Sequence, residues 1–169
     1  MQPPQEANMT ERREKIMDEL TELYSCRPTK AIFQRAWHPD AVFEDPLVKA
    51  QGWTQYEAQW FAMPWLFSRS RPISRRVILS TETPNRLVYR QVQEYTLRFL
   101  GRTQRIESVI DLELDESDRI TRMADKWNGE ELPTYYGAEW LRWLNARVTP
   151  WLVKVPKEGT LPETRSKNE

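Results

Sequence analysis

Two adjacent segments, RLVYRQVQEYTLRF at residues 86–99 and RTQRIESVIDLEL at residues 102–114, decide the fold of this chain. Apolar and polar side chains alternate in both segments, as they do in a β-strand with one buried face. Similar runs at 72–82 and 119–128 flank them, and short turns rich in Pro, Asn, Gly, Asp and Ser separate the four runs. The pattern predicts four long strands joined by hairpins into an antiparallel sheet.

Helical periodicity precedes this sheet. We expect a first helix beginning at Thr10 and a shorter helix after Pro28, followed by a short strand at 41–43. The run Thr54-Gln55-Tyr56-Glu57 has the pattern of a capping box and predicts a third helix, which Pro64 should bend or end. Three helical segments therefore come before the strands.

One amphipathic helix follows the strands, near residues 134–148, and Pro150 is expected to stop it. Its apolar stripe is predicted to consist of Trp140, Leu141, Leu144 and Val148. The element order predicts an α+β cone: a strongly curved, mixed or antiparallel sheet wrapped by the N-terminal helices, enclosing an apolar pocket. The expected domain spans 10–152, between polar and disordered ends at 1–9 and 153–169.

Composition excludes several classes of function. Lys plus Arg and Asp plus Glu number 25 each, and a net charge of zero disfavours a nucleic-acid partner. The single cysteine, Cys26, cannot form an internal disulfide, which suits a reducing compartment. The N-terminus lacks the pattern of a signal peptide, and no run is apolar enough to span a membrane. We therefore expect a cytoplasmic protein.

The motifs that would bring in a cofactor or a metal are missing from the sequence. It contains no Gly-rich phosphate loop, no Cys-x-x-Cys pair and no Gly-x-Ser-x-Gly elbow. His38 is the only histidine, and no partner residues for a metal site accompany it. The expectation is a protein without cofactor or metal.

Asp125 carries the sharpest chemical prediction. Alternation places it on the inward face of the last strand with Met123 and Trp127. A carboxyl among apolar neighbours loses hydration, so its pKa should rise toward neutrality, where it can act as a general acid or base. The alternative is a structural aspartate that hydrogen-bonds a Trp or Tyr side chain and holds the strand end.

Other inward side chains complete the predicted pocket. From the strand 86–99 these are Tyr89, Gln91, Gln93 and Tyr95. Such groups can orient a substrate carbonyl or stabilise an enolate, but they can equally satisfy one another inside the cone.

Further pocket residues are expected outside that strand. The third helix should turn Tyr56 and Trp60 toward the sheet. Alternation turns Arg75 inward, where it could pair with Asp125 or bind an acidic ligand, although an arginine cluster at a sheet edge in water explains it as well. Asp45, which precedes Pro46, either caps a turn or lines the mouth of the pocket.

The segment His38-Pro39-Asp40-Ala41-Val42-Phe43-Glu44-Asp45-Pro46, the helix at Thr54 and the strand run ending in Asp125-Lys126-Trp127-Asn128 together resemble the NTF2-like superfamily. The likeness is strongest to SnoaL-like domains, including small fungal members, and covers residues 10–148. Members include polyketide cyclases, ketosteroid isomerase, scytalone dehydratase, limonene-epoxide hydrolase and non-catalytic domains. The resemblance implies a cone and, in the enzymes, cofactor-independent chemistry by an Asp or His.

Only Asp125 matches that acid/base position, with Tyr95 and Gln93 as its partners, and no histidine occurs in the strands. Two hypotheses follow. The first is an isomerase, cyclase or lyase for a small apolar carbonyl compound, polyketide-like or terpenoid-like, with the ring clamped by Trp60 and Trp127. The second is a non-catalytic binding module, touching a membrane through the Trp-rich helix. A homodimer through the outer face of the sheet is expected by analogy.

Overall fold

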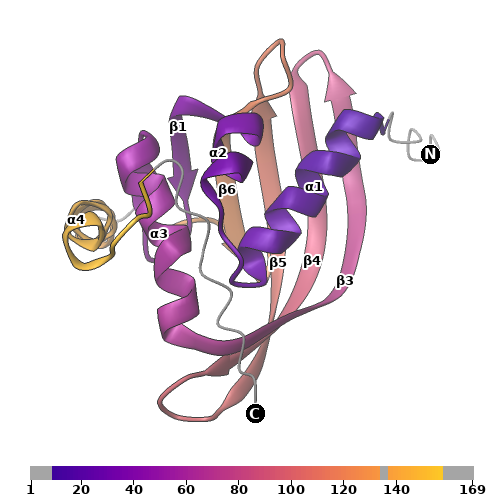
Figure 1. The fold of residues 1–169 in the computed structure, drawn as a ribbon. Coiled ribbons are helices and arrows are strands. Elements are labelled where there is room, and N and C mark those ends of the chain that lie inside the picture. Colours follow the sequence, from indigo (N-terminus) through magenta and orange to yellow (C-terminus); the bar gives the residue numbers. More distant parts are fainter. Residues whose placement is uncertain (1–8, 134–136, 158–169) are drawn as a thin grey trace, which may run out of the picture.

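The computed structural model describes residues 9–133 and 137–157, and shows helices packed around one curved sheet (Figure 1). Residues outside these ranges include the predicted helix start at 134–136 and most of the ends that we expected to be disordered. The elements in chain order are α1 (Glu11–Tyr24), α2 (Lys30–Ala36), β1 (Trp37–Glu44), β2 (Lys49–Gln51), α3 (Trp53–Leu66), β3 (Phe67–Glu82), β4 (Asn85–Leu97), β5 (Thr103–Leu114), β6 (Ile120–Trp127) and α4 (Ala138–Leu152).

The sheet has the strand order β2-β1-β6-β5-β4-β3. The four predicted strands pair as antiparallel hairpin neighbours, β1 joins β6 in parallel, and β2 pairs antiparallel with β1. The helices α1, α2 and α3 cover the concave face, and α4 lies beside α3 and β2 (Figure 1). This arrangement is the predicted α+β cone, with a mixed sheet.

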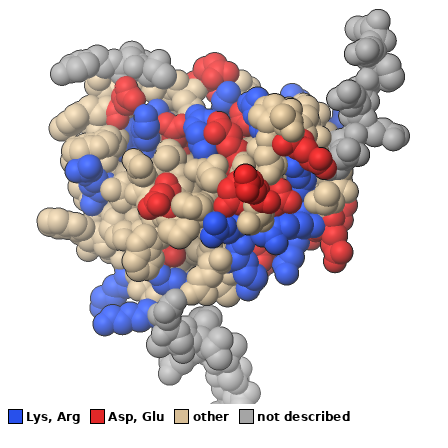
Figure 2. Space-filling model, turned by 90° about the horizontal axis from the view of Figure 1, so that it is seen from above, with Lys and Arg blue, Asp and Glu red and all other residues tan. Residues whose placement is uncertain are grey.

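The concave face carries the side chains that alternation placed there. Its fully buried members include Leu87, Tyr89, Ile110, Leu112 and Met123. On the convex face, charged side chains pair across strands, as in Arg90–Glu107 and Arg105–Glu94. Seen from above, the upper end of the molecule also carries acidic and basic side chains interspersed (Figure 2).

Two local predictions about the helices need correction. Helical spacing with Ile32, Phe33 and Ala36 predicted that Trp37 belongs to the second helix, but Trp37 begins β1. The Thr54–Glu57 capping box is wrong, because α3 begins at Trp53 after Gly52, and Glu57 pairs with Lys30. Pro64 lies inside α3, whose last carbonyl groups are satisfied from outside: Arg98 donates to the main-chain oxygens of Pro64 and Trp65.

The C-terminal helix also differs from the prediction. Pro150 lies within α4, which continues to Leu152, and three of the four residues of the predicted apolar stripe are exposed: Trp140, Leu141 and Val148. The buried residues of α4 are Arg142 and Ala146. Within the described ranges, no helix combines the length and apolarity needed to cross a bilayer.

Candidate functional site

A cavity of about 250 Å³ lies between α3, α4 and the concave face of the sheet. Most of its surface is apolar, and aromatic rings form much of it. The aromatic lining residues are Tyr24, Phe43, Trp60, Phe67, Tyr95 and Trp127. The acidic lining residues are Asp45 and Asp125, which makes this cavity the candidate active site.

Asp125 projects from β6 into this cavity and is almost fully buried. Its Oδ2 accepts a hydrogen bond of 2.7 Å from the phenol of Tyr24 at the end of α1. Its Oδ1 is buried and has no hydrogen-bond partner among the described residues. The Tyr24 ring packs edge-on against Trp60, with 5.0 Å between ring centroids, so the donor is held in place by an aromatic neighbour.

Burial raises the pKa of Asp125 to about 6. The hydrogen bond from Tyr24 acts in the opposite direction, and so do the nearby side chains of Ser108 and Trp127, although neither forms a hydrogen bond of normal geometry with Oδ1. The pKa of Tyr24 is raised well above its ordinary value by burial and by the charge of Asp125. Near neutral pH, Asp125 can therefore exchange a proton while Tyr24 stays a neutral donor.

Asp45 supplies a second carboxyl to the same cavity. Its Oδ1 accepts hydrogen bonds of 2.7 Å from the backbone N–H groups of Leu47 and Val48, so it caps the turn between β1 and β2. Burial first, and the charge of Asp125 second, raise the pKa of Asp45 to about 7. Asp45 thus fills both roles considered from the sequence, and the charge of Asp125 favours its protonated form.

Five of the predicted site residues line the cavity: Asp125, Tyr95, Trp60, Trp127 and Asp45. Tyr95 packs against Phe67 with 4.7 Å between ring centroids. Burial raises its pKa far above the usual range, and its hydroxyl forms no hydrogen bond with any residue that the structure describes. A neutral phenol in an apolar cavity is a ready donor to a ligand oxygen.

Gln93 lies elsewhere, although it shares the inward face. It is buried, and its Nε2 donates to Ser70 Oγ at 2.9 Å and to the main-chain oxygen of Tyr24 at 3.3 Å. The amide is committed to joining β4, β3 and α1, and it does not line the cavity. The structure therefore does not place Gln93 in the cavity with Asp125 and Tyr95, as the sequence predicted.

Four more predicted residues are buried outside the cavity lining. Tyr89, Gln91 and Met123 belong to the packed core of the sheet. Tyr56 stacks on Trp37 at 4.8 Å between centroids and donates to the main-chain oxygen of His38.

Arg75 lies on the inward face of the edge strand β3, opposite Gln91, as alternation predicted, but it does not line the cavity. Arg75 is exposed, with Nη2 2.8 Å from Asp18 Oδ1 and Nη1 3.1 Å from Thr21 Oγ1 on α1. The interpretation of Arg75 as a sheet-edge arginine in water fits this placement.

Sequence reasoning missed Tyr24, Phe67 and the polar α4 residues Asn145 and Thr149. Tyr24 was recognisable as the last member of the apolar stripe of α1, but nothing in the sequence indicated that its hydroxyl meets β6. Among the described residues, no group of three or more His, Cys, Asp or Glu side chains is placed to hold a metal ion.

Comparison with known proteins identifies the fold. No protein-family model and no curated protein matches this sequence. An NTF2-like protein from Anabaena variabilis is similar in structure, with a TM-score of 0.60 at 15% identity over 75% of this chain and 94% of that protein.

Two further solved structures are similar to this chain in fold. A proposed polyketide cyclase from Xanthomonas campestris has a TM-score of 0.57 at 14% identity, covering 77% of this chain and 94% of its own. A proposed isomerase from Bacillus subtilis has a TM-score of 0.56 at 18% identity, covering 70% and 90%. The chain therefore has an NTF2-like fold.

Proposed function

We propose that this protein is a cofactor-independent isomerase, cyclase or lyase that acts on a small apolar carbonyl compound by proton transfer in the cone cavity. The observation that carries the proposal is Asp125, a buried carboxyl with its pKa moved to about 6 at the wall of an aromatic cavity. A group with a pKa near the working pH combines a usable ionised fraction with useful basicity.

Each of four cavity residues has its own role in the proposed proton transfer. Ionised Asp125 removes a proton from the carbon next to the substrate carbonyl, and the electron pair moves onto the carbonyl oxygen to form an enolate. The neutral phenol of Tyr95 donates to that oxygen, and protonated Asp45 is a second donor and the acid that can return a proton. Tyr24 holds the carboxylate of Asp125 in one orientation through its 2.7 Å hydrogen bond.

The cavity restricts the substrate class. Its volume of about 250 Å³ and its aromatic lining suit a compact, largely apolar ring system with one carbonyl group, polyketide-like or terpenoid-like. Trp60 and Trp127 are placed to contact such a ring. The names given to two proteins of similar fold, an isomerase and a polyketide cyclase, point to the same class of chemistry.

Hydrogen–deuterium exchange tests this proposal directly, because it detects proton removal whatever product is formed afterwards. Cyclic ketones and β-dicarbonyl compounds are incubated in D₂O with the protein, and exchange at the α-carbon is followed by NMR. We expect exchange with at least one compound and a loss of at least 100-fold in Asp125→Asn. Asp40→Asn, which alters an exposed carboxyl outside the cavity, is the matched control. Full exchange by Asp125→Asn would refute the acid/base role.

A non-catalytic binding module is the second candidate, and the exposed face of α4 favours it. Trp140 and Trp151 are exposed on that helix, and exposed tryptophans are common where a protein meets a partner or a membrane surface. In that case ligands would bind in the cavity with no exchange above the solvent rate for any compound. Tryptophan fluorescence titration run beside the exchange assay separates the two candidates.

A further inference from the structure

One end of the molecule exposes a group of apolar side chains that no other part of the described chain covers. Trp65 and Leu66 end α3, and Phe99 and Leu100 occupy the turn between β4 and β5; their exposed fractions are 66%, 44%, 74% and 70%. The Trp65 and Phe99 rings meet edge-on with 5.6 Å between centroids. These four residues, here named the apolar tip, form the lower end of the molecule in Figure 1.

The turn between β4 and β5 is ordered and presents its two apolar residues outward. Leu97 N–H donates to Arg102 O and Gly101 N–H donates to Leu97 O, both at 2.9 Å, and Gly101 has a positive φ of 61°. Turn positions usually hold Gly, Pro, Asn, Asp or Ser. Phe99 and Leu100 at the apex do not pack into the core of this protein, so only a binding partner could bury them.

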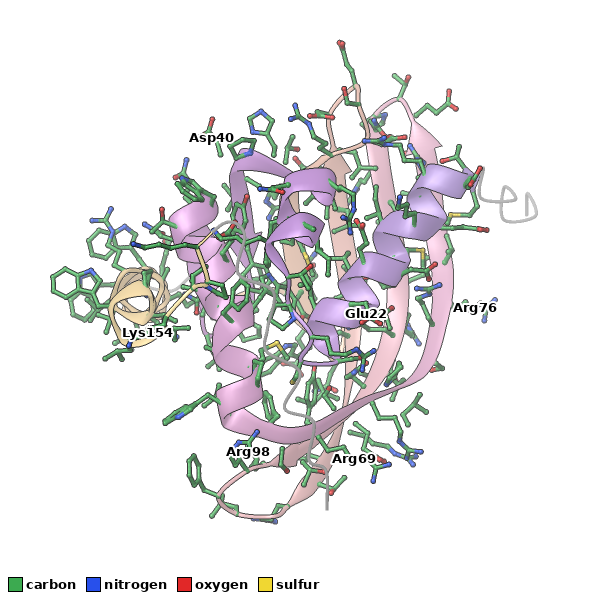
Figure 3. All side chains as sticks on the ribbon, viewed as in Figure 1. Glu22, Asp40, Arg69, Arg76, Arg98 and Lys154 are labelled. Atoms are coloured by element: carbon green, nitrogen blue, oxygen red, sulfur yellow. The ribbon has the colours of Figure 1, made fainter. Side chains whose placement is uncertain are left out.

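The apolar tip is surrounded by positive charge. Segments 64–72 and 96–105 contain five arginines and no Asp or Glu. Two of them are neutralised through Glu94; the other three form no ion pair with any described residue, namely Arg69, Arg98 and Arg102. Figure 3 shows Arg69 and Arg98 at this end of the molecule. The opposite end, in Figure 2, carries both signs of charge interspersed.

We propose that the apolar tip docks on an anionic lipid bilayer, with Trp65, Leu66, Phe99 and Leu100 entering the interfacial layer and Arg69, Arg98 and Arg102 lying at the headgroups. Apolar insertion and attraction between arginine and acidic lipid add together at such a surface. A second copy of this chain fits less well, because a symmetric contact would bring the unpaired arginines of both copies together. The anionic surface is the partner that complements both features.

The position of the tip connects it with the cavity. Leu66 belongs to the apolar tip and also lines the cavity, and Phe67, the next residue, lines it too. Docking at this end therefore places the cavity beside the lipid phase, where apolar compounds concentrate. The docking goes beyond the proposed catalysis and does not depend on it, because a non-catalytic binder would use the same surface.

Vesicle flotation tests the docking with the full chain. Vesicles of phosphatidylcholine alone are compared with vesicles containing 30% phosphatidylserine, at low and high salt. We expect binding to the anionic vesicles that weakens with salt and is weak on neutral vesicles. Phe99→Ser/Leu100→Ser should lower the partition coefficient at least tenfold, and Arg69→Gln/Arg102→Gln about 30-fold.

Two matched variants sharpen the test. Arg12→Gln/Arg76→Gln removes two exposed arginines that lie away from the tip and should leave partition unchanged; Figure 3 shows Arg76 on β3. Trp140→Ser/Trp151→Ser alters the exposed face of α4, and partition should survive it within about twofold. Circular dichroism confirms that each variant keeps its fold.

Several results would overturn the proposal. These are no flotation with anionic vesicles, equal flotation with neutral vesicles, and loss of flotation in the α4 variant with retention in the Phe99/Leu100 variant. Sedimentation is run in parallel: a dimer that Phe99→Ser/Leu100→Ser dissociates would assign the tip to a second copy and would equally overturn lipid docking. The exchange assay of the proposed function is independent of all these outcomes.

Discussion

At the scale of single residues, the carboxylate of Asp125 has fewer hydrogen-bond donors than a buried charge needs. One oxygen accepts a hydrogen bond from Tyr24 and the other is buried without a partner among the described residues. Burying a carboxylate with only one good donor is costly, so the carboxyl retains its proton to higher pH than an exposed aspartate does. Such a group destabilises the fold when ionised, which is typical of a residue kept for chemistry.

This cost predicts how stability depends on pH. The folded state binds the Asp125 proton more tightly than the unfolded chain does, so the group lowers the free energy of unfolding as pH rises from about 4 to about 6. Replacement by Asn removes this dependence, since Asn has no proton to lose. We expect Asp125→Asn to gain about 2 kcal/mol relative to wild type between pH 4 and pH 7.

Urea unfolding at the two pH values measures that gain. Asp40→Asn, which alters an exposed carboxyl outside the cavity, serves as the control variant. A pH-independent difference between Asp125→Asn and wild type would mean that the Asp125 carboxyl is adequately solvated in the folded protein.

The sequence predicted Asp125 because alternation in a short, regular strand assigns a face directly. It could not predict Tyr24, whose contact with Asp125 spans 101 positions of the chain and depends on how α1 crosses the sheet. Gln93 shows a further limit: alternation gave its face correctly, but only the packing of α1 and β3 decides that its amide is used there and not in the cavity.

At the scale of elements, α4 is held in place by a buried arginine more than by apolar packing. Arg142 Nε donates to the main-chain oxygen of Asp45 at 2.8 Å, Nη1 donates to that of Pro133 at 3.1 Å, and Nη2 lies 3.8 Å from Glu44 Oε1. Helical periodicity assigned the apolar face of α4 to Trp140, Leu141, Leu144 and Val148. It was misleading because the groove beneath α4 is lined with carbonyl oxygens that need a donor.

Loss of this arginine should release α4. We expect Arg142→Met to lower the free energy of unfolding by about 3 kcal/mol, since it leaves several buried oxygens without a donor. Amide exchange should accelerate throughout Ala138–Leu152. Arg147→Met is the matched control on the same helix: Arg147 is exposed and lies 3.7 Å from the Trp143 ring centroid, so its loss should cost less than about 1 kcal/mol. Equal stability of the two variants would contradict the anchoring role.

The strands and helices differ in how well sequence defined them. The hairpin strands β4, β5 and β6 were predicted nearly to their ends because they are regular and joined by short turns. The start of strand β3 was harder to predict, since β3 begins at Phe67 directly after α3 and its register against β4 shifts in three places.

At the scale of the whole molecule, the cone separates its functions in space. The concave face holds the cavity and its two carboxyls, the convex face carries ion pairs, and the lower end carries the apolar tip together with Arg69 and Arg98, which form no ion pair with a described residue. Fold could be inferred from the order of elements, because few architectures place three helices, a hairpin sheet and a final helix in that order. The chemistry could not be inferred in this way, because it depends on which side chains meet across the cavity.

The most direct test of this account is an NMR titration of the Asp125 side-chain carboxyl carbon, assigned by comparison with Asp125→Asn. The account predicts an apparent pKa of about 6, and a further increase in Tyr24→Phe, because that variant loses the hydrogen bond that favours the ionised form. A pKa at or below about 4 in the wild-type protein would show a well-solvated structural aspartate and would contradict the proposed proton-transfer chemistry.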